Sequence, residues 1–221
     1  MSFAATTNPV VSALTSRDTQ AADQGQYFVA LTPTPGTGII SGGSVQAFTE
    51  TTPYLVLFNS STTVSIYPMY LRGHITVIGA GVSTKVNWTV TLDTGNRYSS
   101  AGTALAVSNT NMASSAASAG IATVGAVVAT AASGTRRIVG QYQVKHTVIE
   151  VVHDTFSFNW GGGAVQPSTS SIAANSTTPT YASFQGAPLV IGPQQSMVIV
   201  RWGDSQTTGS TSEIEMGWIE K

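Results

Sequence analysis

The chain has 221 residues, of which 42% are hydrophobic and 9% are charged, and its formal net charge is −1. The hydrophobic fraction is high enough to form a core and the length suits one all-β domain, so wholesale disorder is excluded. The lack of a basic excess argues against nucleic-acid binding, and the absence of cysteine excludes disulfides and thiolate metal sites.

The N-terminal segment, residues 1–25, has little hydrophobic periodicity, and we expect it to form an extended arm. It lacks a positively charged start followed by an apolar block, so we expect no secretion signal and synthesis in the cytoplasm. The longest apolar run, residues 121–132, is shorter than the roughly 20 residues that a membrane helix needs, so no membrane partner is expected. The remainder, residues 26–221, is predicted to be a single domain.

Short runs with period-two alternation, bounded by turn-forming residues, predict strands along this domain. The clearest is KVNWTVTLD, residues 85–93, in which Val86, Trp88 and Val90 share one face. Pro68 is expected at a bulge, a bend or a sheet edge, because it cannot donate to a β-ladder. The predicted strand regions are residues 26–32, 45–50, 53–59, 63–79, 85–93, 136–160, 188–192, 196–203 and 213–220.

Two long polar stretches, residues 93–112 and 164–187, are predicted to be loops. Loops of this length are uncommon in a compact domain and usually carry function or disorder. We expect residues 93–112 to be ordered and to pack along their own sandwich or a sister subunit. No segment has a clear helical period, and residues 108–120 are expected to form at most a turn or two. The whole pattern predicts an all-β fold, an antiparallel β-sandwich of the jelly-roll type.

The segment HTVIEVVHD contains four side chains that can ligate a divalent metal: His146, Glu150, His153 and Asp154. On a strand, His146 and Glu150 share a face while His153 points the other way. These groups therefore do not converge, and we expect neither a metal site nor a cofactor. A solvated or subunit-facing strand explains them better.

No motif predicts catalysis. The chain has no G-x-S-x-G elbow, and GGG at residues 161–163 lacks the Lys-Ser/Thr of a phosphate loop. No pair of acidic residues stands out as a glycosidase pair. Asn87 and Asn175 match the glycosylation pattern, but Asn87 lies in a predicted strand and no secretion signal precedes it, so both are discounted. We expect no catalytic residues and no enzyme activity.

The four tryptophans all fall in or at the ends of predicted strands. We expect them to be core anchors rather than sugar-stacking platforms, since a sugar-binding module would expose several of them together. They are Trp88, Trp160, Trp202 and Trp218.

Arg97 follows a strand end in DTGNRYSS, where a turn should expose it. Its guanidinium can hold a carboxylate with two hydrogen bonds. A local bond to Asp93 or Glu150 that orders the loop is slightly favoured over an ion pair between subunits.

In this order, five phrases make the chain similar to a known class of proteins: GTGI (36–39), PYLVLFN…IYPMYLRGHIT (53–76), TLDTGNRYSSAGTAL…SNTNM (91–112), VVHDTFSFNWGG (151–162) and PLVIGPQQSMVIVRW…SEIEMGWIE (188–220). The chain resembles virion structural proteins of short-tailed bacteriophages, of the capsid decoration or cement type. That resemblance implies a jelly roll that self-associates, often as a homotrimer, and binds the major capsid protein on the outside of the icosahedral head.

The expected function is therefore adhesion to a phage head, after synthesis in the host cytoplasm. Low surface charge suits this role, because it reduces the desolvation cost when surfaces meet. Two alternatives remain: a tail or fibre jelly roll that binds a receptor or carbohydrate, and a β-sandwich hydrolase or cupin-like enzyme.

Overall fold

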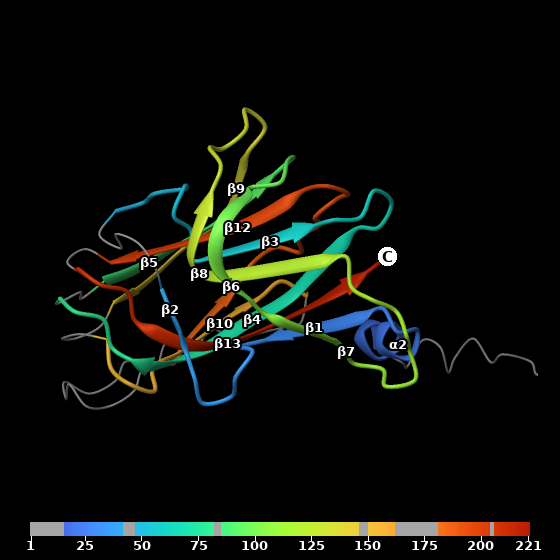
Figure 1. The fold of residues 1–221 in the computed structure, drawn as a ribbon, viewed down its shortest axis with the longest axis horizontal. Coiled ribbons are helices and arrows are strands. Elements are labelled where there is room, and N and C mark those ends of the chain that lie inside the picture. The colour runs from blue at the N-terminus through green and yellow to red at the C-terminus, as the bar shows by residue number, and fades with distance from the viewer. Residues whose placement is uncertain (1–15, 42–46, 82–84, 146–149, 162–180, 204–205) are drawn as a thin grey trace, which may run out of the picture.

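A computed structural model describes residues 16–41, 47–81, 85–145, 150–161, 181–203 and 206–221 (Figure 1). In these residues the strands form two sheets. The strands of sheet A are β1 (Tyr27–Leu31), β2 (Ile39–Ile40), β4 (Ile66–Val77), β7 (Ala106–Asn109), β10 (Thr155–Asn159), β11 (Tyr181–Gln185) and β13 (Thr211–Glu220). Those of sheet B are β3 (Leu55–Asn59), β5 (Lys85–Asp93), β6 (Tyr98–Ala104), β8 (Gly120–Ala129), β9 (Arg137–Lys145) and β12 (Ser196–Gly203).

The connectivity of these strands is that of a jelly roll. The order in sheet A is β11-β10-β4-β13-β1-β7, with β2 beside β13, and in sheet B it is β6-β8-β3-β12-β5-β9. The first half of the chain pairs antiparallel with the second half in reverse order, as β1 with β13, β3 with β12, β4 with β10 and β5 with β9. A long hairpin rolled into two sheets gives this pattern, so the predicted sandwich is confirmed. Only β10 and β11 pair in parallel in the described residues.

The core lies between the sheets and is rich in aromatic rings. Trp88 of β5 packs against Tyr54 and Phe156, with ring centroids 5.2 and 4.9 Å apart. Trp160 and Trp218 are also buried in this core, as predicted. The prediction is wrong for the fourth tryptophan.

Trp202 lies on the outer face of sheet B, because it shares a face with Val198 and Val200, while Ile199 between them points into the core. It is half-buried there, with its ring edge-on to Phe48 at 5.2 Å.

The strand predicted over residues 63–79 is one strand, β4, with an irregularity at Pro68. Tyr70 pairs with Gly217, but Pro68 pairs with Trp218, so the register shifts between these two pairs. The extra residue on β4 is a bulge, which confirms the expected position of the proline.

Several local predictions are wrong, among them the loop over residues 164–187, whose described end, Tyr181–Gln185, forms β11. Arg17–Asp23 form the helix α2, whose first turn is capped by the Ser16 hydroxyl, so the described part of the N-terminal segment is not an extended arm; residues 1–15 lie outside the described residues. Such a short helix, with only Ala21 buried, shows no apolar stripe in sequence. Residues 47–50 form no strand. In residues 188–192 a single bridge, from Ile191 to Ile66, replaces the predicted strand.

Residues 93–112 are ordered and contain β6 and β7 rather than a loop without secondary structure. β6 pairs with β8 of sheet B, and β7 pairs with β1 of sheet A. Between them, Leu105 is buried and its N–H donates to Ala122 at 2.9 Å. The segment thus crosses from one sheet to the other and covers an open edge of its own sandwich, which confirms one of the two expected packings.

Two register shifts interrupt the pairing of β6 with β8. Ala101 and Gly102 lie there with φ angles of 59° and 76°, in the left-handed region that glycine adopts most readily. Every residue of β6 is exposed, so no alternation in the sequence marks it as a strand.

We expect Leu105→Ala to destabilise the domain by about 2–5 kcal/mol, because it removes a buried side chain at the crossing between the sheets. Urea denaturation measures this change. Met112→Ala is the matched control, since that side chain is 98% exposed and its truncation should leave the free energy of unfolding unchanged. Equal stability of the two variants would contradict the role of the crossing.

Candidate functional site

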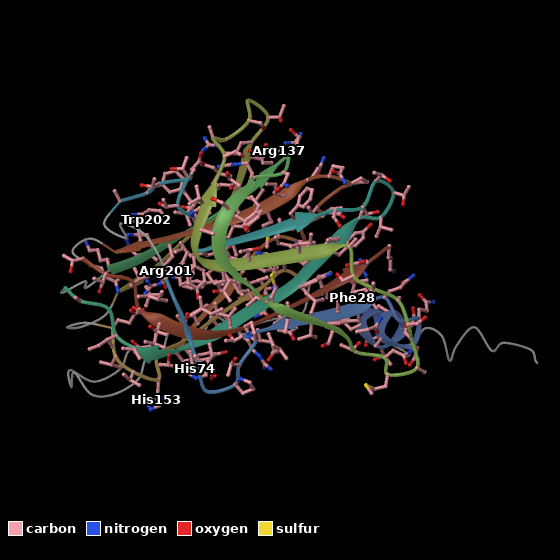
Figure 2. The ribbon with its side chains drawn as sticks, in the orientation of Figure 1. Phe28, His74, Arg137, His153, Arg201 and Trp202 are labelled. Carbon is pink, nitrogen blue, oxygen red and sulfur yellow. The ribbon has the colours of Figure 1, made fainter. Side chains whose placement is uncertain are left out.

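The predicted ligand residues of HTVIEVVHD are not brought together, and His146 lies outside the described residues. Glu150 forms an ion pair with the buried Arg201. Asp154 is buried, whereas His153 is exposed on a turn with a φ of 72° (Figure 2). Across the described ranges, no group of three His, Cys, Asp or Glu side chains could hold a metal ion.

Two other candidates from the sequence, Asn87 and Gly161, lie in or just after strands. Asn87 lies within β5, where it accepts a hydrogen bond from Gln143 at 2.8 Å. Gly161 follows β10, while residues 162–163 and Asn175 lie outside the described residues. In the described part of the chain, no helix has the length and hydropathy needed to cross a bilayer.

Arg97 is buried and binds Asp93, as the favoured interpretation predicted, with Nη1 3.0 Å from Oδ2. Its expected exposure is wrong, because both side chains are at most 2% exposed. Nε donates to the carbonyl of Thr130 at 2.9 Å, and Nη2 donates to that of Glu50 at 3.2 Å. The guanidinium therefore joins the end of β5 to two other segments of its own chain.

Asp93 is held from two sides. Its oxygens accept hydrogen bonds from the hydroxyl and the N–H of Ser133, besides the bond from Arg97. Burial alone would raise the pKa of Asp93, but these hydrogen bonds and the ion pair outweigh burial and lower it. The pair is an internal anchor of the fold.

A hollow of about 460 Å³ lies on the outer face of sheet A. It is bounded by the turn after β1, which contains Pro35, and by Tyr181 of β11. We call this hollow the sheet A groove. Besides Tyr181, its polar lining residues are Thr32, Arg72, His74, Thr155, Ser157, Glu213 and Glu215.

Apart from Thr32, these side chains form two parallel rows, because paired residues on neighbouring strands share a face of a sheet. The first row crosses β11, β10, β4 and β13 through Tyr181, Thr155, His74 and Glu213. The second crosses the same strands through Ser183, Ser157, Arg72 and Glu215. Residues far apart in sequence thus meet on one face through strand register alone.

In the second row, Glu215 accepts hydrogen bonds from two neighbouring side chains. Its Oε2 accepts from Nη2 of Arg72 at 2.7 Å, and its Oε1 accepts from the hydroxyl of Tyr70. Burial and this hydrogen bond raise the pKa of Tyr70, so the hydroxyl keeps its proton and remains a donor. The hydrogen bond to Glu215 likewise raises the pKa of Arg72. The guanidinium stays charged, and its side chain is 63% exposed.

The first row is tied to the turn after β1. Oε2 of Glu213 lies 3.1 Å from Nε2 of His74, and Oε1 accepts a hydrogen bond from the N–H of Gly36. His74 comes from β4 on the lower side of the molecule in Figure 2. The turn that borders the groove is therefore positioned by a groove residue.

Gly217 allows Tyr70 to lie across β13. A Cβ added at this glycine would be 2.4 Å from the tyrosine ring, closer than real contacts allow. The absent side chain thus makes room for the ring, which in turn lies 5.7 Å from the guanidinium of Arg72.

A second surface lies beyond the groove, at the start of β13. Thr211 pairs with Ile40 of β2 on one side and with Val77 of β4 on the other. Ile40 is 54% exposed and Val77 is 55% exposed, and the neighbouring Ile78 is exposed as well. We call Ile40, Val77 and Ile78 the end patch.

Sequence reasoning singled out no residue of the groove or of the end patch. The alternation in YLRGHIT and EIEMGWIE could have placed Arg72, His74, Glu213 and Glu215 on outward faces. It could not pair the two strands, which are about 140 residues apart.

The comparisons with known proteins add no family assignment. No family model matches the chain, and no curated protein matches its sequence.

We expect stability to fall as pH drops below the ordinary aspartate pKa of 3.8, in part because of Asp93. A lowered pKa in the folded state gives stability that is complete above the ordinary value of 3.8 and is lost as pH falls through the folded-state pKa. Asp93→Asn should cost about 3–5 kcal/mol at neutral pH, since it leaves Arg97 buried without its counter-ion, and should flatten this acid slope.

Urea denaturation at a series of pH values measures both effects. Asp23→Asn is the control, since Asp23 is exposed at the end of α2. An acid slope in Asp93→Asn as steep as that of the unsubstituted protein would contradict the assignment.

Proposed function

We propose that the chain is a capsid decoration protein of a bacteriophage, which stabilises the icosahedral head from outside by bridging shell subunits. The observation that carries the proposal is the end patch, a group of exposed aliphatic side chains at one end of a sandwich with few charges. Apolar area removed from water stabilises a contact by roughly 25 cal/mol per Å². The sequence resemblance to short-tailed-phage virion proteins supports the same assignment.

A cement protein also needs a domain that keeps its shape under load. The ion pairs Arg97–Asp93 and Arg201–Glu150 lie within the sandwich and tie loop segments to β5 and β12. Arg201 lies 5.5 Å from the ring of Trp88, so the second pair is packed against the aromatic core. Internal anchors of this kind favour a surface that is already in its binding shape, which lowers the entropy cost of association.

The partners of this function are the major capsid protein and further copies of the chain, which we propose form a trimer. Each contact is weak, and symmetry multiplies it over the shell. The protein would be made in the host cytoplasm and act on the head exterior without performing a reaction.

Binding of a receptor by a tail or fibre remains the alternative. It would be favoured by several exposed tryptophans, but Trp88, Trp160 and Trp218 are at most 2% exposed. Trp202 alone of the four reaches the outer surface.

Reconstruction of phage particles that contain the chain tests the proposal directly. Density for the sandwich on the outside of the head is the expected result. Density confined to the tail would support the alternative, and absence of the chain from the particle would overturn both. Light scattering of the purified protein after size-exclusion chromatography tests the trimer.

We expect Ile40→Asp combined with Val77→Asp to weaken binding to phage heads at least about tenfold, since two carboxylates would be buried in an apolar contact. Co-sedimentation with heads that lack the protein measures the loss. Ile121→Asp is the matched control, because Ile121 is a similarly exposed aliphatic residue on β8. Equal binding by the double variant and the control would exclude the end patch as the contact.

A further inference from the structure

We propose that the sheet A groove binds a neutral saccharide. This inference goes beyond head binding, because it assigns a ligand to a different surface and does not depend on where the protein sits in a virion. It rests on the polar rows, on the tyrosines beside them and on the balance of charge in the groove.

Charged side chains are concentrated in the sheet A groove. The chain has only 9 Lys and Arg and 10 Asp and Glu residues in 221. Nevertheless Arg72, Glu213 and Glu215 line one hollow together with His74. Few polar groups converging in a hollow of several hundred Å³ are typical of a small-molecule site.

The spacing of the polar groups in the two rows suits the hydroxyls of a sugar. Neighbouring strands are about 4.8 Å apart, so each row offers donors and acceptors at regular short intervals. Alternate hydroxyls around the rim of a pyranose have a comparable spacing, and each hydroxyl both donates and accepts. Arg72 supplies donors, Glu213 and Glu215 supply acceptors, and the hydroxyl of Thr155 supplies both. The hydroxyl of Ser157 donates to Ser183 at 3.1 Å and so supplies an acceptor.

Tyrosine side chains border the groove. Tyr181 is 48% exposed and lines the groove at its outer strand. Tyr70 and Tyr181 both line a second hollow of about 360 Å³ that shares Arg72 and Ser157 with the groove. The two hollows therefore adjoin at β4 and β10. An aromatic face packs well on the C–H face of a sugar ring, whose hydroxyls then point toward the polar rows.

The charge balance of the groove disfavours an anionic ligand. The positive charge of Arg72 is paired with Glu215, and Glu213 adds a further negative charge. A phosphate, sulfate or carboxylate on the ligand would meet this excess of carboxylates and be repelled. A neutral polyol can donate hydrogen bonds to the carboxylates and accept them from the guanidinium without electrostatic repulsion.

The groove is also organised before any ligand arrives. Glu215 is held by Arg72 and by Tyr70, and Glu213 is held between His74 and the Gly36 N–H. Groups that already occupy one arrangement lose little conformational freedom on binding. The same bonds orient the carboxylates as fixed acceptors.

The test is binding of neutral oligosaccharides of four to six units, from gluco-, xylo- and manno-series, to the purified free protein by titration calorimetry. Binding of at least one series is expected, with Kd below about 10 mM. Tyr181→Ala and Arg72→Ala should each weaken it at least about tenfold. Arg137→Ala is the control for loss of an exposed arginine, since Arg137 lies on β9 of sheet B (Figure 2).

Tyr181→Ala keeps the test decisive should Arg72→Ala fail to fold, because Tyr181 is an exposed residue at the start of an edge strand. Thermal melts confirm that each variant is folded. No binding in any neutral series, binding that both groove variants leave unchanged, or preference for an acidic oligosaccharide or a cationic peptide would each overturn the proposal. Failure here leaves head binding intact, because that is measured with different variants and a different partner.

Discussion

The buried guanidinium of Arg97 is the interaction on which the arrangement of the sandwich depends. It lies where β5 ends and the segment that contains β6 and β7 begins. It bonds to Asp93, to the end of β8 and to the segment before β3. A charge buried in this way is tolerated only when it is paired and hydrogen-bonded. The chain therefore has one permitted arrangement at this corner, and the segment that contains β6 and β7 starts in a fixed direction.

That direction brings β6 and β7 along the side of the sandwich, where they add a strand to each sheet. Leu105 enters the core between them, so a segment with few apolar residues still contributes to the packing. In the described residues, α2 packs near one end of β13 and the turn after β1 lies near the other. The groove lies between that turn and Tyr181 of β11.

Sequence patterns could predict β5 from its alternation, and β3 and β12 from their short continuous apolar runs, because both patterns indicate burial. They could not predict β6, which is held by backbone pairing and is exposed on both faces. The bond from Arg97 to Asp93 was predictable because its partners are four residues apart. The pairs Arg72–Glu215 and His74–Glu213 were not, because only the jelly-roll register brings β4 beside β13.

The direction of β13 has a practical consequence for display. The strand runs from Thr211, beside the end patch, to Glu220, where Lys221 is hydrogen-bonded to Ser65. In Figure 1, the C-terminus lies near α2 and β2 lies toward the opposite side. A fluorescent protein or antigen fused after Lys221 would project from the far pole of the domain, about 30 Å along the strand from the aliphatic residues. Cargo at that pole would leave the end patch unobstructed.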